Sequence, residues 1–347
     1  MRVTVWRSST ELVAPVRAAD QRHLRRDHLY MGLEHDGAVG YGEVAPQPVN
    51  LNGDPSVDSV ISALRVEVLP RLERMVTDTG ELPRWFAVHR VAGPRPASVV
   101  AWSLVEMAVL DHSLRTSGSG LESLWTARQA PATIATVSLL DDESWAVATD
   151  ATRVRAKLRP GSLDEDRVAR LRSLNRPVII DYNCSGGSLE VVSREIERLA
   201  ATVAVAAVEQ PFEPGNLIAH AQLAARDLAP VSLDEGVRSL LDLRLIERYR
   251  AASVVCVKPP RVGGLAAARS IIDAARRAGI RPYVGGFFES PLARATLRHL
   301  AGAFVDEPSD VADVSTRTAA ALEATGDGIG YRPVRAAHDE VVGEFGS

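Results

Sequence analysis

Short runs of β-branched residues alternate with amphipathic stretches from about Thr133 onward, and this alternation predicts strand–helix units. The predicted strands are ATIATVSLL, TRVRAKL, RPVIID, VAVAAVE, APVSLDE, ASVVCVK, RPYVGG and GAFVD. Helices are expected between them over 164–174, 189–201, 215–226, 239–249, 264–278 and 291–303. The units repeat at about 25–30 residues, which is typical of an α/β fold of the (β/α) TIM-type barrel kind. Eight strands favour a closed barrel over an open parallel sheet.

The first third of the chain has a different pattern, which predicts an antiparallel meander. MRVTVWRSS, DHLYMGLEHDG and GAVGYGEVAP alternate apolar and polar residues and are bounded by Asp-Gly and Gly turns. Helical spacing follows over 56–72 and 97–114. We therefore expect an α+β domain over 1–115 and a barrel over 130–325, with the tail over 325–347 packed on the first domain.

Composition and charge narrow the class of protein. Of the 347 residues, 46% are hydrophobic and 24% are charged, which is the profile of a soluble globular protein. The net charge of −4 gives no support to binding of nucleic acid or of an anionic membrane. The two cysteines, Cys184 and Cys256, lack metal-ligand spacing and are expected to be reduced thiols. We see neither a leader peptide nor an apolar run of bilayer length, and so expect a cytoplasmic protein.

Three carboxylates stand at the ends of consecutive predicted strands, namely Asp181 in VIIDYN, Glu209 in AAVEQP and Asp234 in VSLDEG. Asn183 and Glu235 accompany them as supporting residues. A carboxylate at the end of an apolar run is costly to bury unless it is paired or binds a metal. Because the carboxyl ends of barrel strands meet at one face, these oxygen ligands predict a site for Mg²⁺, with Mn²⁺ as a substitute. The alternative for each acid alone is a helix N-cap or a surface ion pair.

Basic residues complete this constellation. Lys258 follows the apolar strand SVVCV, and a desolvated lysine near a metal is expected to have a lowered pKa and to act as a base, unless it extends to solvent. Arg155, Lys157 and Arg159 share one side of their strand, which we predict to be the barrel interior. Lys157 is the preferred second acid/base. Glu289 is expected to position Lys258 or to lie at a helix N-terminus. A hard cation beside a base suits removal of a proton next to a carboxylate, through an enediolate.

These motifs resemble the enolase superfamily, in its muconate-lactonising branch, over nearly the whole chain. That branch has an N-terminal α+β capping domain before a modified (β/α) barrel. Its motifs are a Lys-x-Lys strand, Asp-x-Asn, Glu-Gln-Pro, Asp-Glu, a lysine followed by Gly-Gly, and Glu-Ser. The corresponding residues here are Arg155-Ala156-Lys157, Asp181-Tyr182-Asn183, Glu209-Gln210-Pro211, Asp234-Glu235, Lys258 with Gly263-Gly264, and Glu289-Ser290. The mandelate racemase branch would have a histidine on the strand that ends in GGFFES, and this strand has none.

Within the branch, AKLRPGSLDEDRVARL and VADVSTRTAAALEATGDG are most similar to actinobacterial o-succinylbenzoate synthases. The resemblance implies Mg²⁺-dependent dehydration of a cyclohexadiene carboxylate to o-succinylbenzoate, in menaquinone synthesis. It implies that Lys157 abstracts the proton α to the carboxylate and that Lys258 stabilises the enediolate from across the ring. It further implies a homo-oligomeric enzyme whose partner is a small-molecule carboxylate.

Several alternatives stay open at the level of sequence. In the register Lys157-Leu158-Arg159, an arginine stands at the usual base position, and Lys258 is then the main base. The loop PQPVNLNGD does not closely match the synthase pattern, so N-acylamino acid racemase, cycloisomerase and a specialised natural-product enzyme are alternatives. A non-catalytic metal-binding scaffold is the alternative from another class. The basic cluster Arg22–Arg26 is either a loop over the site or a solvated face.

Overall fold

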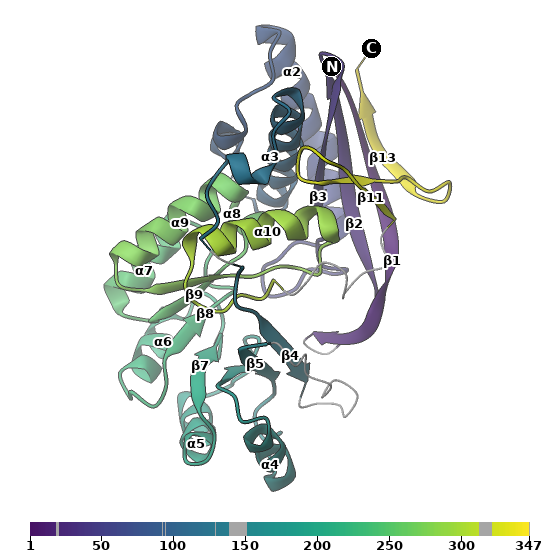
Figure 1. Cartoon of the computed structure of the whole chain (residues 1–347). Helices are drawn as coiled ribbons and strands as arrows, with labels where there is room; N and C mark the ends of the chain where they lie inside the picture. The colour runs from purple at the N-terminus through teal and green to yellow at the C-terminus, as the bar shows by residue number, and fades with distance from the viewer. Residues whose placement is uncertain are drawn as a thin grey trace.

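The computed structural model describes residues 1–18, 21–91, 93, 95–128, 130–138, 151–311 and 321–346. Its two main parts are an antiparallel sheet with helices packed on it and a parallel (β/α) barrel (Figure 1). Both ends of the chain lie in the first part, because the C-terminal strand pairs with the N-terminal strand.

The N-terminal sheet is antiparallel throughout, so the predicted meander is confirmed. In the order β13-β1-β2-β3, it consists of β13 (Glu340–Phe345), β1 (Arg2–Ala18), β2 (Gln21–His35) and β3 (Ala38–Val44). Asp36 and Gly37 have φ values of 48° and 78°, the positive values that a type I′ turn between β2 and β3 needs. A separate two-stranded sheet pairs β11 (Leu322–Ala324) with β12 (Tyr331–Pro333).

The basic cluster Arg22–Arg26 belongs to β2, so its interpretation as a loop over the site is wrong. Arg25 is exposed, whereas Arg26 is 2% exposed, as the alternation of neighbouring side chains along a strand requires. The buried Arg26 guanidinium donates hydrogen bonds to the Ala45 carbonyl over 2.5 Å and to Oε1 of Gln47 over 3.0 Å. The end of the cluster thus contributes to the packing of the N-terminal domain.

The helical layer of this domain packs against the sheet through one long, almost fully buried helix. The layer comprises α1 (Val57–Ala63), a π-helical turn η1 (Leu64–Val68), α2 (Leu69–Thr79), a 3₁₀ helix η2 (Trp85–Val91) and α3 (Pro96–Thr116). Glycine at position 42 lets α3 lie directly on β3, because a Cβ there would be 2.4 Å from the Leu104 carbonyl oxygen. By length and composition α3 could cross a membrane, contrary to the sequence prediction, but 83% of its most apolar stretch is buried inside the protein.

Within the described residues, seven parallel strands form the barrel sheet in the order β10-β9-β8-β7-β6-β5-β4. They are β4 (Ile134–Ser138), β5 (Arg153–Lys157), β6 (Val178–Asp181), β7 (Val205–Glu209), β8 (Val231–Leu233), β9 (Val254–Val257) and β10 (Arg281–Val284). The helices of the barrel are α4 (Glu165–Ser173), α5 (Leu189–Ala200), α6 (Leu217–Ala224), α7 (Leu240–Tyr249), α8 (Pro259–Val262), α9 (Leu265–Arg277) and α10 (Pro291–Phe304), preceded by η3 (Leu121–Ser123). The predicted alternation of strands and helices is therefore confirmed.

The eighth predicted strand, GAFVD, is wrong, because residues 302–304 are the last turn of α10. Its apolar residues complete the buried face of that helix, and a short apolar run cannot be assigned to strand or helix from periodicity alone. Ser309 and Asp310 take the place between the two edge strands. The Ile134 amide donates to the Ser309 carbonyl over 3.0 Å, and the Asp310 amide donates to the Val284 carbonyl over 2.9 Å.

Polar side chains fix where several barrel helices begin. Asp164, Ser188, Asn216 and Ser239 each accept a hydrogen bond from a backbone N–H in the first turn of the helix that follows. Such caps satisfy donors that the helix itself leaves open. Inside the barrel, a small apolar cluster fills the space between the strands; it consists of Ile134, Ile179, Ala207, Val254, Cys256 and Tyr283.

Buried carboxylates of the N-terminal domain join it to the barrel, and we call Glu43 and Glu106 the seam acids. Glu43 accepts hydrogen bonds from the amides of Ser290 and Ala293 over 2.6 and 3.0 Å, at the start of α10. Glu106 on α3 accepts from backbone amides in the first turn of α9. Because these donors belong to helix N-termini, they fix the orientation of α9 and α10 against the N-terminal domain.

Candidate active site

The three acids predicted to bind a metal stand at the carboxyl ends of adjacent barrel strands. Asp181 ends β6 and is in register with Glu209, which ends β7. Asp234 directly follows β8, the next strand in the sheet. These side chains are 1%, 1% and 3% exposed. The apolar strand before each acid is buried, so the sequence places the three carboxylates along one rim of the barrel.

Each lysine hydrogen-bonds to a different acid of this rim. Nζ of Lys157, the last residue of β5, donates to Oδ2 of Asp181 over 3.0 Å. Nζ of Lys258, which follows β9, donates to Oδ2 of Asp234 over 2.8 Å. Across the five neighbouring strands the order is therefore Lys258, Asp234, Glu209, Asp181, Lys157. We call this set the mouth row.

Lys157 and Lys258 are also the only lysines in the chain, because every other residue among the 40 Lys and Arg is arginine. Arginine can replace lysine wherever a positive charge is sufficient, but it does not give up its proton in proteins. The two positions that keep lysine are the two ends of the mouth row. At these two positions, unlike at the arginines, the side chain is able to release its proton.

The strand TRVRAKLR places only part of its predicted triplet inside the barrel. Arg155 is 4% exposed and lies within the barrel, and Lys157 is at the rim. Arg159 lies beyond the end of β5 and is exposed, so the prediction that it faces the interior is wrong. The strand ends before a turn at Pro160-Gly161, where glycine has φ of 78°. This geometry favours the Arg155-Ala156-Lys157 register.

Lys258 has an ion-pair partner, Asp234, that was not predicted from the sequence. Burial lowers the pKa of Lys258, but the negative charge of Asp234 outweighs burial, and the pKa lies above its ordinary value. The sequence prediction considered burial and did not include this ion pair. Glycine at position 285 leaves room for the lysine side chain, because a Cβ there would be 3.0 Å from Cε of Lys258.

Glu209, at the centre of the mouth row, is among like charges. Burial raises the pKa of Glu209 to about 8; Arg155 opposes this shift, while the charges of Asp181 and Asp234 add to it. Nε of Arg155 donates to Oε2 of Glu209 over 3.2 Å. A carboxylate in such surroundings gains stability in its charged form when a cation is nearby.

The predicted supporting residues Asn183 and Glu235 lie beside the mouth row. Oδ1 of Asn183 accepts a hydrogen bond from Nζ of Lys157 over 2.7 Å. Burial raises the pKa of Glu235 to about 6, and the charge of Asp234 adds to this shift. Nδ2 of Asn52, from the loop PQPVNLNGD, donates to Oε1 of Glu235 over 3.3 Å. That loop therefore reaches the site from the N-terminal domain.

Glu289 does not pair with Lys258. Its Oε2 lies 3.0 Å from an Nη of Arg294, and its Oε1 accepts from the Phe287 amide over 2.5 Å. The second interpretation, an acid just before the N-terminus of α10, describes it better. Phe287 is the residue of this segment that contacts the lysine, since Nζ of Lys258 lies 4.7 Å from the centre of its ring.

Arg261, which was not predicted from the sequence, joins the mouth row to the N-terminal domain. Its Nη1 donates to Oδ1 of Asp234 over 2.6 Å. Its Nε and Nη2 donate to the two carboxylate oxygens of Asp54 over 2.8 and 2.7 Å. The sequence signal for Arg261 was its place one helical turn after Lys258. Gln210, the middle residue of the Glu-Gln-Pro motif, also had no predicted role, and its Oε1 accepts a hydrogen bond from the Asp234 amide over 3.0 Å.

By residue type and strand position, the mouth row fits a hard cation such as Mg²⁺. Its three buried carboxylates supply only oxygen ligands, and their mutual repulsion is what a cation would relieve. As the side chains stand, no group of three or more His, Cys, Asp or Glu in the described part of the chain is placed to hold one ion. In this arrangement Lys157 and Lys258 form ion pairs with Asp181 and Asp234.

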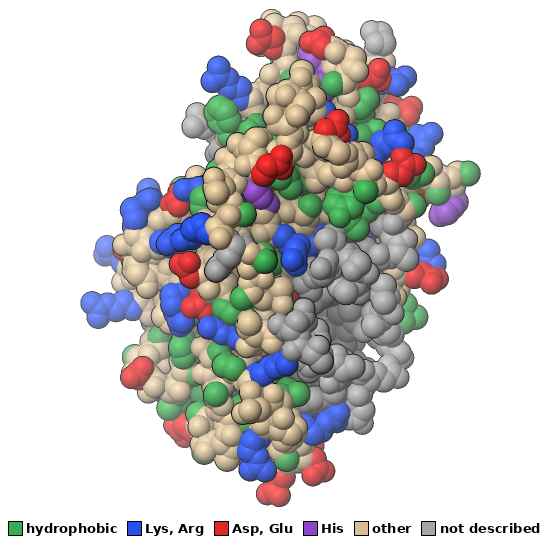
Figure 2. Space-filling model, viewed as in Figure 1, with side chains coloured by type: hydrophobic (Ala, Val, Ile, Leu, Met, Phe, Trp, Pro, Cys, Tyr) green, Lys and Arg blue, Asp and Glu red, His purple; other side chains and the backbone are tan. Residues whose placement is uncertain are grey.

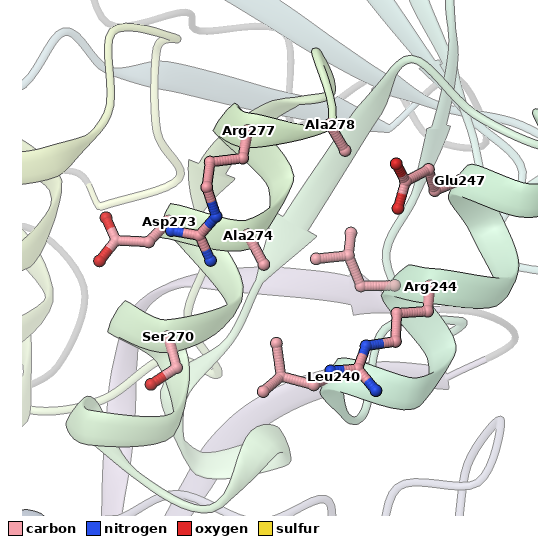
Figure 3. A pocket seen from close by; sticks show the side chains of 9 residues that line it. Leu240, Arg244, Glu247, Ser270, Asp273, Ala274, Arg277 and Ala278 are labelled. Atoms are coloured by element: carbon pink, nitrogen blue, oxygen red, sulfur yellow. The ribbon is translucent and has the colours of Figure 1, made fainter.

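A surface groove of about 420 Å³ lies elsewhere, on the outer side of the barrel between α7 and α9 (Figure 3). Arg244 and Glu247 line it from α7, and Asp273 and Arg277 from α9. None of these four residues follows a barrel strand, so the groove is separate from the mouth row. Basic and acidic side chains are both spread over the face shown in Figure 2, in agreement with the small net charge.

Comparison with known proteins identifies the family. The family model described as "Enolase C-terminal domain-like" matches residues 142–329, a span that contains the whole mouth row. An N-succinylamino acid racemase from an Amycolatopsis species is 26% identical over 312 residues, which are 84% of this chain and 80% of the relative. An o-succinylbenzoate synthase from Enterococcus faecalis is 32% identical over 159 residues, which are 45% of this chain and 42% of the relative.

A solved structure has the same fold over almost the whole chain. A probable mandelate racemase from Alicyclobacillus acidocaldarius superposes with a TM-score of 0.79 at 24% identity, covering 99% of this chain and 92% of that one. The likeness at this identity concerns the fold, and it supports the assignment of a modified (β/α) barrel with an N-terminal antiparallel domain.

Proposed function

Because the chain belongs to the enolase superfamily, we propose that it removes the proton α to a carboxylate of a small-molecule substrate. Relatives include a synthase, racemases and an epimerase, so the chain is an enzyme of this superfamily. The specific reaction we propose is dehydration of a hydroxylated cyclohexadiene carboxylate to o-succinylbenzoate. The motif order of the chain supports this choice, and so does the name of the E. faecalis relative.

One observation carries the proposal, namely that the only two lysines of the chain stand at the two ends of a row of buried carboxylates. A base and an acid are both needed to remove a proton and then expel a hydroxyl group. Arginine, which fills every other basic position apart from histidine, could do neither. Lys157 is therefore the proposed acid/base residue of the dehydration, and Lys258 is the proposed hydrogen-bond donor to the enediolate.

Asp181, Glu209 and Asp234 are the proposed ligands of Mg²⁺. When bound, Mg²⁺ supplies a positive charge that stabilises an enediolate. The three carboxylates come from adjacent strands, as one ion requires, and their buried position excludes most of the water that would weaken the interaction.

The steps that the side chains perform can be followed atom by atom. Lys157, in its neutral form, takes the proton from the carbon α to the carboxylate. Lys258 keeps its proton and donates a hydrogen bond to the enediolate from the other end of the mouth row. The leaving hydroxyl group then takes the proton held by Lys157 and departs as water, which returns Lys157 to its neutral form. Asn183, which accepts from Nζ of Lys157 over 2.7 Å, keeps this side chain in place.

The symmetry of the mouth row favours a second candidate, racemisation of an N-succinylamino acid. A racemase needs one base on each face of the substrate, and the two lysines lie at opposite ends of the row. In that reaction each lysine removes the proton in one direction and returns it in the other. The name of the Amycolatopsis relative supports this candidate.

The test follows the absorbance of the cyclohexadiene when the purified full chain meets the synthase substrate, with Mg²⁺ or with EDTA. We expect loss of absorbance that EDTA stops and that Lys157→Ala abolishes. If the diene is unchanged but the α-proton of an N-succinylamino acid exchanges with D₂O, the racemase is the correct assignment. If the protein binds Mg²⁺ and neither substrate reacts, both proposals are overturned.

A further inference from the structure

A second set of polar groups lies inside the barrel, one layer below the mouth row. Arg155 precedes Lys157 by two positions on β5, so its side chain faces the same side at a lower level. Tyr283 comes from β10, far along the sheet from β5. They are 4% and 2% exposed, respectively. We call Arg155 and Tyr283 the floor pair.

Both members of the floor pair donate to the same oxygen. The Tyr283 hydroxyl donates to Oε2 of Glu209 over 2.7 Å, and Nε of Arg155 donates to that oxygen over 3.2 Å. Nη2 of Arg155 also donates to the Tyr283 hydroxyl over 3.2 Å. The two donors therefore support each other as well as the carboxylate, and Glu209 is held from below through one oxygen.

The floor pair is anchored on its far side. Nη1 of Arg155 donates to Oδ2 of Asp310 over 2.7 Å, in the segment that lies between the two edge strands of the barrel. The apolar side chains of the inner cluster, among them Ile179, Ala207 and Cys256, pack with Tyr283 of the floor pair. In such surroundings an unpaired charge is costly, so the hydrogen-bonded arrangement is strongly preferred over any other.

Arginine suits position 155 because of the geometry of its head group. One guanidinium here reaches three acceptors, on β7, on β10 and on the closing segment. A single ammonium group is a point charge and lacks this planar fork. Since arginine keeps its proton, Arg155 cannot exchange protons with a substrate. On this strand Arg155 can therefore only hold other groups in place, whereas Lys157, two residues later, can also transfer a proton.

We propose that Arg155 and Tyr283 are positioning residues that fix the Glu209 carboxylate for a divalent cation. The inference rests on the proposed function, in which Glu209 is a ligand of Mg²⁺. Partners of metal-binding carboxylates are commonly needed for tight binding, even though they do not touch the ion.

The experiment measures the Mg²⁺ dissociation constant by titration calorimetry of the substrate-free protein. Tyr283→Phe removes the donor to Glu209, and Arg155→Lys keeps the charge but removes the fork. Two matched controls change the same residue types elsewhere in the barrel. Tyr182→Phe removes a 2.8 Å hydrogen bond to Glu195, and Arg153→Lys changes an arginine of the same strand that pairs with Glu307.

We expect Tyr283→Phe and Arg155→Lys to weaken Mg²⁺ binding by about 10-fold or more, and the two controls to leave it unchanged. The inference is overturned if the wild type binds Mg²⁺ and both floor-pair variants, shown to be folded by circular dichroism, bind it equally well. Absence of Mg²⁺ binding by the wild type would instead remove the metal site of the proposed function, and the inference with it. If one variant does not fold, the other decides between these outcomes.

Discussion

Glu43 and Glu209 are both fully buried carboxylates at the end of an apolar strand, but one lies at the seam between the two parts of the molecule and the other lies in the mouth row. Burial raises the pKa of Glu43, yet hydrogen bonds from His28 and Ser290 outweigh it, so this pKa lies below its ordinary value. For Glu209, burial and the charges of the neighbouring acids outweigh the lowering effect of Arg155, and the pKa is raised to about 8.

The difference teaches that burial does not distinguish a structural acid from a functional one, whereas the partners do. A seam acid receives donors from a helix N-terminus, so its negative charge is already stabilised. Glu209 stands between Asp181 and Asp234, whose charges disfavour its ionised form. The first arrangement joins two domains, and the second is the one that we propose to bind an ion.

The largest expected effect comes from Lys157→Arg. Arginine keeps the positive charge beside Asp181, so folding and the ion pair should persist, but the side chain can no longer accept a proton. We expect kcat to fall by about 10²–10⁴, the usual contribution of a general base. The measurement is turnover of the synthase and racemase substrates by the variant.

The matched control is Arg159→Lys, which makes the opposite exchange just beyond the end of β5, at an exposed position outside the site. Its kcat should equal that of the wild type. Near-normal turnover by Lys157→Arg would contradict the assignment of Lys157 as a base, and would leave Lys258 as the proton acceptor.

The second prediction compares the two glutamates directly, beginning with Glu209→Gln. We expect Mg²⁺ affinity to fall by at least about 10-fold, because a neutral amide replaces a charged ligand. The unfolding free energy without metal should stay close to that of the wild type, since the raised pKa of Glu209 shows that its charged form is unfavourable there. Calorimetry and urea unfolding measure the two quantities. If Glu209→Gln greatly lowers the unfolding free energy and leaves the Mg²⁺ affinity unchanged, Glu209 is a structural acid like Glu43.

Much of the fold and of the site could be predicted from the sequence, because both follow from local patterns. Alternation of β-branched runs with amphipathic helices gave the barrel units, and an acid at the end of each run gave Asp181, Glu209 and Asp234. The false strand GAFVD shows the limit of this approach. Its residues are equally apolar in a helix, and the true closing segment at Ser309 is too short to have a pattern.

The missed features all depend on contacts between residues far apart in the chain. Arg261 binds Asp54 across 207 positions, and no local pattern reports that distance. The ion pair of Lys258 with Asp234, which raises the pKa of Lys258, was missed because it depends on how the strands are staggered. Glu289 is the exception, because its partner, Arg294, is close to it in the chain.

The third prediction is the counterpart at the seam. Glu43→Gln places an amide NH₂ among the donors of Ser290 and His28, so at least one hydrogen bond is lost. We expect the unfolding free energy to fall by about 1–3 kcal/mol. Mg²⁺ affinity should be unchanged, because Glu43 is not part of the mouth row. Urea unfolding and calorimetry measure both, and loss of Mg²⁺ binding without loss of stability would abolish the distinction between the two regions.

The smallest expected effect is a pH dependence at the other end of the seam. Burial raises the pKa of Glu106 to about 8, against hydrogen bonds from the first turn of α9. The folded state thus binds this proton more tightly than the unfolded chain, whose glutamate pKa is about 4.3. Its stabilising contribution is complete below that pH and is lost as the pH rises through about 8.

The wild type should therefore lose unfolding free energy between pH 6 and 8 relative to Glu106→Gln, with a slope of at most about 1.4 kcal/mol per pH unit. The positive end of the α9 dipole favours the ionised form and should reduce the slope below this limit. Urea unfolding of both proteins across this pH range measures the difference. If the unfolding free energies of the two proteins change in parallel with pH, the prediction is wrong. The N-terminus of α9 then keeps Glu106 ionised, and its donors stabilise its charge as fully as those of Glu43 do.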